Sequence, residues 1–175
     1  MAPFGSSEKR RIPTAEFHER WKKVQEGVRA KGLDCLIAHS NEADYANVRY
    51  LTNYWPIFES AGVIVPPEGE PSLLIGPESE TFARDTSETQ KIHKLVAYRE
   101  SAEPDYPGVK VDTFASVFQK VLGKTPKRIG IASHAIFPLP VWEGIKEAAP
   151  EAEIVKSDEL IVDLRIIKSA AELDV

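Results

Sequence analysis

The stretch Leu33-Asp34-Cys35-Leu36-Ile37-Ala38 is a short, nearly continuous apolar run. A strand that is covered on both faces has this pattern, whereas a strand with one wet face alternates apolar and polar residues. In the segment before the run, charged residues separate apolar side chains at helical spacing, namely Phe17, Trp21, Val24 and Val28. The stretch therefore predicts a buried strand that follows an amphipathic helix.

Further along, short apolar strands alternate with amphipathic helices. We expect strands at residues 61–65, 72–75, 91–97, 128–132 and 153–155. We expect helices at about 77–86, at 111–123, after Pro138 and after Ser157. The turn residues between the first two strands make them an antiparallel hairpin. The pattern predicts an α/β three-layer sandwich, with a mixed, mostly parallel sheet of about six strands and helices on both faces.

Composition and charge exclude several classes of protein. The 175 residues are 42% hydrophobic and 28% charged, which is typical of one soluble globular domain. The formal net charge is -5 and no basic stripe is present, so we expect no nucleic-acid partner. No apolar stretch approaches the length of a membrane span, and the N-terminus lacks the apolar core of a signal peptide. The single cysteine, Cys35, is interpreted as core and fits a reducing compartment, so we expect a cytoplasmic protein.

The usual motifs of catalysis and metal binding are missing from the sequence. No two of the four histidines have i, i+4 spacing, and no glycine-rich phosphate loop occurs. Ser133-His134 is not a nucleophile elbow, and neighbouring residues in a strand point to opposite faces. His39 is the strongest exception, because it ends the first strand and α/β sheets place sites at the carboxyl ends of their strands.

Residues 45–60 are unusually rich in aromatic and amide side chains. These aromatic residues either close the end of the sheet or form a contact surface, and aromatic residues beside an arginine are favoured at interfaces and in pockets. The candidates for a substrate pocket or an interface are Trp55, Phe58, Tyr54, Arg49, Asn53 and His39.

The last residues begin a helix that the sequence does not complete. Ser169-Ala170-Ala171-Glu172 fits a capping box, yet only three residues follow it. An isolated helix needs roughly 12–15 residues to be even marginally stable in water. Either the chain frays here or another unit begins here.

Two segments resemble the N-terminal domain of the creatinase/prolidase family, which includes Xaa-Pro dipeptidases, aminopeptidase P and creatinase. The first segment is Asp34 to Ala38, followed by a polar loop and Asn47-Val48-Arg49-Tyr50-Leu51-Thr52-Asn53-Tyr54; the second is Leu164 to Glu172. The resemblance spans about residues 14–175 and implies a ribonuclease H-like motif. It implies an N-terminal domain at 14–165 and a junction to a C-terminal catalytic domain at 166–175. Residues 1–13 are polar and contain proline, so we expect them to form a flexible arm.

The resemblance also implies a division of labour. In the family, the C-terminal "pita-bread" domain holds two divalent metal ions, Mn, Co or Zn, through two aspartates, one histidine and two glutamates. We therefore expect no catalytic or metal-binding residue in this chain, and no activity from it alone. The implied role is to support a homodimer and to shape the pocket for a small peptide or other small-molecule substrate of a metallopeptidase-type hydrolase.

The aromatic stretch helps to distinguish which member of the family this chain resembles. Phe58 stands where creatinases have a substrate-holding phenylalanine, but Ser60 stands where they have an arginine. That difference weakens the case for creatine, whose carboxylate suits an arginine. Trp55 is placed to act as the covering tryptophan of aminopeptidase P. The alternatives are an N-domain of a creatinase-like amidinohydrolase or lyase, and a stand-alone α/β ligand-binding or interaction domain.

Overall fold

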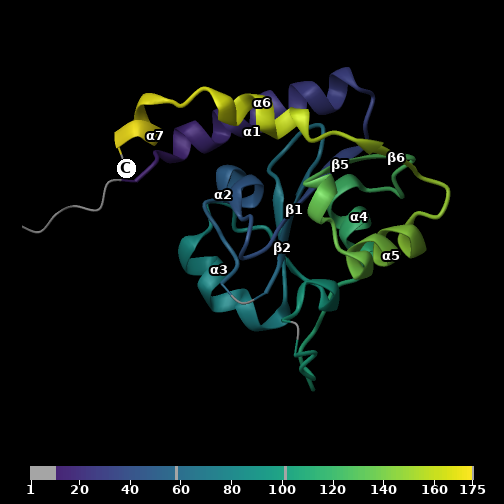
Figure 1. Ribbon diagram of the computed structural model, residues 1–175. Coiled ribbons are helices and arrows are strands. Elements are labelled where there is room, and N and C mark those ends of the chain that lie inside the picture. Colours follow the sequence, from purple (N-terminus) through teal and green to yellow (C-terminus); the bar gives the residue numbers. More distant parts are fainter. Residues whose placement is uncertain (1–10, 58, 101, 175) are drawn as a thin grey trace, which may run out of the picture.

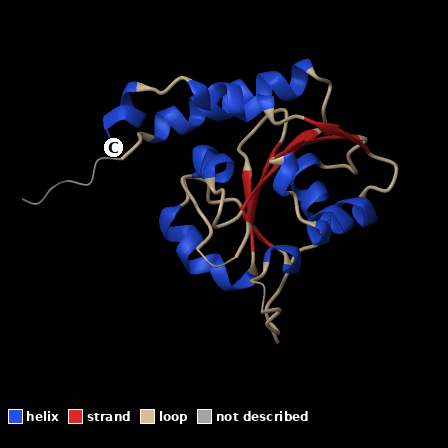
Figure 2. Cartoon of the chain, in the orientation of Figure 1, coloured by secondary structure: helices blue, strands red, loops and turns tan. Residues whose placement is uncertain are grey.

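A computed structural model describes residues 11–57, 59–100 and 102–174 (Figures 1 and 2). Its helices are α1 (Thr14–Ala30), α2 (Ala46–Thr52), α3 (Glu80–Thr86), α4 (Phe114–Leu122), α5 (Leu139–Ala148), α6 (Glu159–Ile166) and α7 (Ala170–Asp174). Its strands are β1 (Cys35–Ser40), β2 (Ala61–Val65), β3 (Ser72–Ile75), β4 (Ile92–Lys94), β5 (Arg128–Ala132) and β6 (Glu153–Lys156). Short 3-10 helices cover Pro77–Ser79, Val96–Tyr98 and His134–Ile136.

The six strands form one mixed sheet in the order β4-β3-β2-β1-β5-β6. β2 pairs antiparallel with both β1 and β3, whereas β1 with β5, β3 with β4, and β5 with β6 are parallel pairs. The predicted hairpin is the β2–β3 pair. The prediction of a mixed, mostly parallel six-stranded sheet is confirmed.

Helices cover both faces of the sheet, so the three layers are also confirmed (Figure 1). Leu36 and Ala38 of β1 pack into a cluster with α1, α2 and α6, whereas Cys35 and Ile37 pack into a cluster with α4 and α5. Successive side chains of a strand point to opposite faces, and all four of these are fully buried. Burial on both sides explains why residues 35–38 are apolar throughout.

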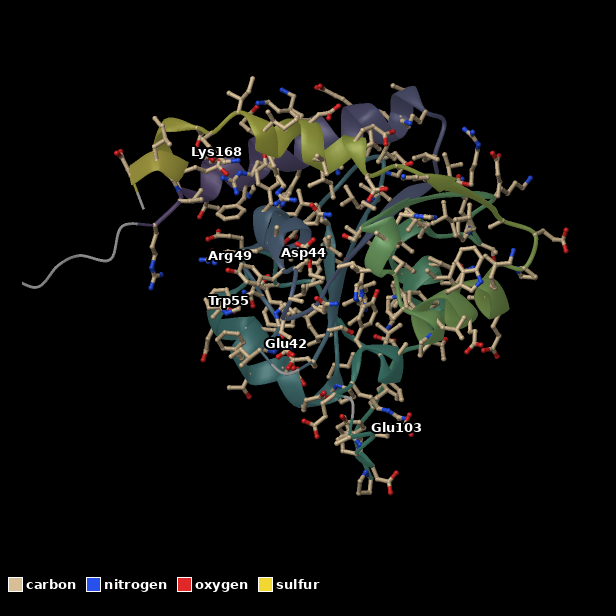
Figure 3. The ribbon with its side chains drawn as sticks, viewed as in Figure 1. Glu42, Asp44, Arg49, Trp55, Glu103 and Lys168 are labelled. Carbon is tan, nitrogen blue, oxygen red and sulfur yellow. The ribbon has the colours of Figure 1, made fainter. Side chains whose placement is uncertain are left out.

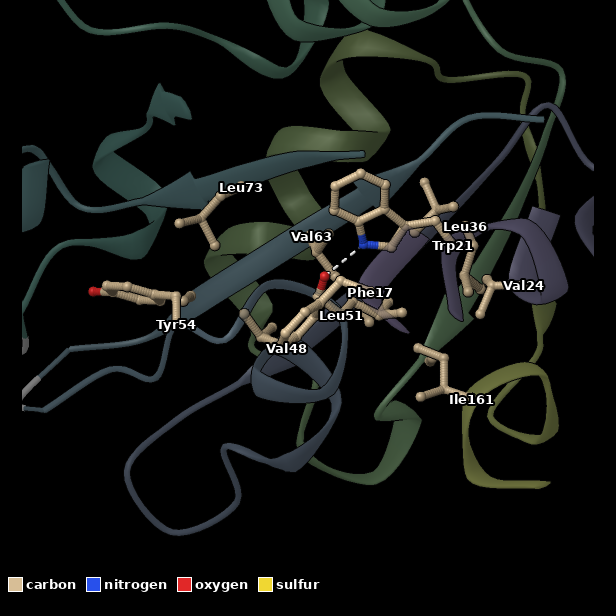
Figure 4. Packing of buried hydrophobic residues seen from close by; sticks show 14 of the residues in the cluster. Phe17, Trp21, Val24, Leu36, Val48, Leu51, Tyr54, Val63, Leu73 and Ile161 are labelled. Atoms are coloured by element: carbon tan, nitrogen blue, oxygen red, sulfur yellow. Dashed lines mark hydrogen bonds between the residues drawn. The ribbon is translucent and has the colours of Figure 1, made fainter. Parts of the chain in front are cut away.

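The first cluster is anchored by a tryptophan of α1 (Figure 4). The indole N–H of Trp21 donates to the carbonyl oxygen of Leu51 at 2.6 Å, next to Phe17 and Val48. A buried indole needs a partner for its N–H. The carbonyl of Leu51 lies in the last turn of α2 and has no intrahelical partner to compete for it. This bond ties α1 to α2.

Three local expectations are corrected. The strand predicted at 91–97 ends at Lys94, because its partner β3 ends at Ile75 and Pro77 then starts a 3-10 turn. Helix α6 is preceded by Asp158 rather than capped by Ser157, whose hydroxyl donates to the Val155 carbonyl. Thr14, whose hydroxyl would allow it to cap the first helix, is instead the first residue of α1, and Pro13 precedes it. Among the helices described, none is long and apolar enough to cross a membrane.

Candidate functional site

Helix α2 and the loop after it carry the aromatic stretch. The backbone amides of Ala43 and Asp44 donate to the Asn41 side chain, which holds the loop after β1 in a turn. The backbone amide of Val48 donates to the Ser40 hydroxyl, which ties the start of α2 to the end of β1. The helix ends at Asn53, whose φ of 62° is left-handed. Asparagine tolerates this conformation better than most residues. Its side-chain amide donates to the Thr86 carbonyl at 3.1 Å, so Asn53 both ends α2 and fastens it to α3.

Arg49 and Trp55 form one surface feature (Figure 3). The guanidinium carbon of Arg49 lies 4.7 Å from the Trp55 ring centre and 5.6 Å from that of Tyr45. The Trp55 ring in turn meets Phe82 of α3 edge to face, with the ring centres 5.5 Å apart. Arg49 is exposed, and its side chain makes no ion pair within the described chain. A guanidinium held flat against aromatic rings keeps its donors free for a carboxylate.

Two other candidates, Tyr54 and His39, are buried rather than exposed. The Tyr54 ring is fully buried, packs on Phe82 and donates its hydroxyl to Glu59 at 2.6 Å. Burial raises the pKa of the Tyr54 phenol, and the hydrogen bond to Glu59 raises it further. Ser79 donates to the same carboxylate oxygen. Tyr54 therefore anchors the loop that carries Trp55, through its contacts with Phe82 and Glu59.

His39 lies at the carboxyl end of β1 and is 2% exposed. Its ring centre is 6.0 Å from that of Tyr98 and 5.9 Å from that of Phe137. Burial lowers the pKa of His39 to about 4, so the imidazole is neutral at pH 7. Phe58, the remaining candidate, lies outside the described residues.

A buried polar chain connects α6 to the ends of two strands. Arg165 donates to the side-chain oxygen Oδ1 of Asn47 at 2.7 Å, and the side-chain Nδ2 of Asn47 donates to the Ser133 hydroxyl at 2.8 Å. Ser133 completes the chain by donating to the backbone carbonyl of His39 at 2.5 Å. The hydroxyl of Ser133 is therefore occupied in holding β5 to β1. Both segments that carry the family resemblance contribute to this chain, through Asn47 and Arg165.

A second network, which we call the Arg20 cluster, consists of Glu16, Arg20, Tyr50, Ser169 and Glu172. Arg20 is 4% exposed, pairs with Glu16 at 2.5 Å and Glu172 at 3.5 Å, and donates to the Tyr50 carbonyl at 2.8 Å. Its guanidinium also stacks on the Tyr50 ring at 4.2 Å.

The capping box predicted at the end of the chain closes the Arg20 cluster. The Ser169 amide donates to the Glu172 carboxylate and the Glu172 amide to the Ser169 hydroxyl, so the box is confirmed. Ser169 also donates to Glu16, which joins α7 to α1. No sequence pattern singles out Arg20, which stands among other charged residues of α1.

Within residues 11–57, 59–100 and 102–174, no group of three or more histidine, cysteine, aspartate or glutamate side chains is placed to hold a metal ion.

The sheet order and the flanking helices define an α/β domain of the mixed-sheet class. The sequence matches the Creatinase/Prolidase N-terminal domain over residues 20–167, and the chain belongs to this family. Among curated proteins, no sequence matches the chain.

Solved structures support the fold. The prolidase from Pyrococcus horikoshii OT3 superposes with a TM-score of 0.64 at 22% identity, over 90% of this chain and 38% of that one. The dipeptidase PepE from Mycobacterium ulcerans gives a TM-score of 0.66 at 17% identity, over 94% of this chain and 40% of that one. A proline dipeptidase structure from Streptococcus pneumoniae gives 0.63 at 16% identity, over 85% of this chain and 98% of that one. The chain thus spans about two fifths of the first two proteins.

Proposed function

We propose that this chain is the N-terminal, non-catalytic domain of a metal-dependent Xaa-Pro dipeptidase- or aminopeptidase-like hydrolase, in which it contributes to dimerisation and shapes the substrate pocket. Family membership supports the first part of the proposal. The Arg49 guanidinium, which lies over the Trp55 ring and has no hydrogen-bond partner for its donors among the described residues, is the observation that carries the second.

The chemistry of this surface suits a small peptide with a free carboxylate. Arginine presents parallel N–H donors that match the two oxygens of a carboxylate. The rings of Tyr45 and Trp55 restrict the guanidinium, so less side-chain entropy is lost when a ligand binds. Trp55 adds a flat apolar face that can exclude water from beside a proline ring.

The metal ions belong, in this proposal, to the domain that follows. Two divalent ions, Mn, Co or Zn, activate water and stabilise the leaving group in dinuclear hydrolases. The role of this chain is to present Arg49 and Trp55 toward that centre, in a homodimer. A cytoplasmic location is part of the proposal, since one similar structure is described as the cytoplasmic peptidase PepQ from Mycobacterium tuberculosis.

The test uses the full-length protein, loaded in turn with Mn, Co and Zn and assayed on Xaa-Pro dipeptides. We expect Arg49→Ala to lower kcat/KM by about tenfold or more on substrates with a free carboxylate. The loss should be small on carboxyl-amidated substrates, and Arg49→Lys should restore part of it. Arg84→Ala is the matched control, because Arg84 is a half-exposed arginine already paired with Glu80.

Two outcomes contradict the proposal. Wild-type turnover in a Trp55→Ala/Phe58→Ala variant removes the pocket role. Absence of Xaa-Pro hydrolysis with all three metals favours a binding or interaction domain instead. Sedimentation of the full-length protein tests the dimer separately.

A further inference from the structure

A concave surface lies between the edge strand β6 and helix α5. Figure 1 shows β6 and α5 on the opposite side of the sheet centre from α2 and α3. The concave surface encloses about 500 Å³, within the roughly 300–1,000 Å³ usual for ligand sites. We call it the β6 groove; its lining is Ile131, His134, Phe137, Leu139, Trp142, Ile154 and Lys156.

The wall that α5 contributes is apolar and open to solvent. Leu139 is 64% exposed and Trp142 is 37% exposed, although both lie in a helix whose other face packs into the core. No aromatic ring of the described chain stacks on Trp142. Large exposed apolar side chains that gather around a hollow mark an interaction site more often than single scattered ones.

The facing wall is a strand edge with free main-chain groups. The amide of Glu153 donates to the Lys127 carbonyl at 2.9 Å, and that of Ser157 to the Ile131 carbonyl at 2.8 Å. Because main-chain groups alternate in direction along a strand, the N–H and C=O groups of Ile154 and Lys156 point away from β5. Beyond β6 the sheet has no further strand within the described residues. Such an edge is a template for an added strand.

The groove has its basic residues at one end, where the Asp158 carboxylate beside them accepts the His134 backbone amide at 3.0 Å. Lys156 and His134 are its only ionisable lining residues, and both lie at the carboxyl ends of their strands or just beyond. No carboxylate lines it. Glu153, at the other end of β6, is held by Arg128 of β5 at 2.7 Å. An occupant should therefore carry negative charge where β6 ends.

We propose that the β6 groove binds the carboxyl-terminal segment of another polypeptide as an added strand parallel to β6. Its apolar side chains lie between Ile154 and Trp142, and its terminal carboxylate lies at Lys156 and His134. Strand addition to a free edge supplies affinity through main-chain hydrogen bonds, and the groove supplies specificity through alternate side chains. A second copy of this chain fits less well, because the carboxylate of its own β6, Glu153, is already held by Arg128.

The test is an array of hexapeptides with free carboxyl ends, randomised at the last four positions, beside a matching array that ends in amides. We expect the chain to be retained by free-acid peptides with an apolar last residue, and about tenfold less by the amides. Lys156→Gln should reduce the free-acid signal to that of the amides. Ile154→Pro should abolish binding while preserving the fold, since proline removes an amide that faces the open edge and none that bonds to β5.

Other occupants give different results. Equal retention on both arrays, or retention unchanged in Ile154→Pro with a native circular dichroism spectrum, overturns the proposal. Loss of binding in Trp55→Ala but not in Leu139→Ser places the peptide at the Arg49 surface and also overturns it. A concentration-dependent dimer that Ile154→Pro dissociates assigns the groove to a second copy. If Lys156 serves only to prevent other strands from pairing with the edge of β6, Lys156→Gln aggregates and neither array retains the wild-type chain. This result also overturns the proposal.

Discussion

On one face of the sheet, α1, α2 and α6 pack over an apolar cluster and around a buried charge, whereas α4 and α5 on the other face pack mainly through apolar side chains and bury no charged residue. Arg20, on the first face, is the only buried lysine, arginine, aspartate or glutamate among the described residues. The stretches 47–54 and 164–172, which resemble the family, lie on that face, and the polar partners there come from distant parts of the chain.

The comparison separates two ways of fixing helices on a sheet. Apolar contacts are non-directional, so they hold α4 and α5 in place without specifying one set of partners. Buried hydrogen bonds and ion pairs demand particular partners, because an unpaired buried polar group is costly. On the face of α1, α2 and α6, the polar contacts therefore fix the position of α7. On the face of α4 and α5, the apolar packing leaves the β6 groove open.

The largest expected effect is on the apolar face. Phe118 is 1% exposed and packs against Phe114 with ring centres 6.1 Å apart. Phe118→Ala leaves a cavity and should lower the free energy of unfolding by about 4 kcal/mol. The half-buried Val121, on the same helix, is the control, and Val121→Ala should cost about 1 kcal/mol. Urea unfolding measures both, and equal losses would show that burial does not rank these positions.

The next effect tests the charged face. Arg20→Ala leaves Glu16 and the Tyr50 carbonyl without their partner and should cost about 3 kcal/mol. Lys31→Ala removes an exposed pair with Glu159 and should cost less than about 0.5 kcal/mol. Arg20→Met keeps most of the packing volume and separates lost contacts from lost charge. If Arg20→Ala proves as mild as Lys31→Ala in urea unfolding, the Arg20 cluster does not stabilise this face.

A smaller effect depends on pH. His39 has a pKa of about 4 when folded and about 6.5 when unfolded, so the unfolded state binds more protons between these values. Stability should therefore fall as pH drops from about 6.5 toward 4, by about 2 kcal/mol at pH 5.

The measurement for His39 is the change in unfolding free energy between pH 7.5 and pH 5. His39→Gln should reduce this change by that amount, whatever its absolute stability. His93, whose pKa is lowered by burial against the opposing effect of Asp112, titrates in wild type and variant alike and so cancels. An identical pH dependence in the variant would mean that His39 is protonated without penalty.

The sequence predicts the elements that local pattern governs. The apolar run at 33–38 predicts β1, although the strand begins at Cys35 and continues to Ser40, and the spacing of Ser169 and Glu172 predicts the capping box. The early end of β4 is not visible in its own residues, because it depends on where β3 stops.

The candidate site is predictable only in part, for a related reason. Arg49 and Trp55 are six positions apart and share one local stretch, so their grouping could be expected. Ser169 and Glu16 are 153 positions apart and Arg165 and Asn47 are 118, and only the folded chain brings them together. The burial of Tyr54 likewise follows from α3, whose Phe82 covers it from another part of the sequence.

The smallest effect compares the two capping boxes of the molecule. Thr113 caps α4 on the apolar face, and Thr113→Ala should lower global stability by about 1 kcal/mol, because α4 unfolds with the core.

Ser169 caps α7, which has five residues and no buried side chain. Ser169→Ala should leave the urea midpoint unchanged, since α7 opens without the core. It should speed exchange of the Glu172 and Leu173 amides by about fivefold, which corresponds to the same 1 kcal/mol acting locally. Hydrogen exchange at pH 7 distinguishes the two cases. A shift of the global midpoint by Ser169→Ala would instead show that α7 is part of the cooperative unit, so that the Arg20 cluster transmits stability from the junction into the sheet.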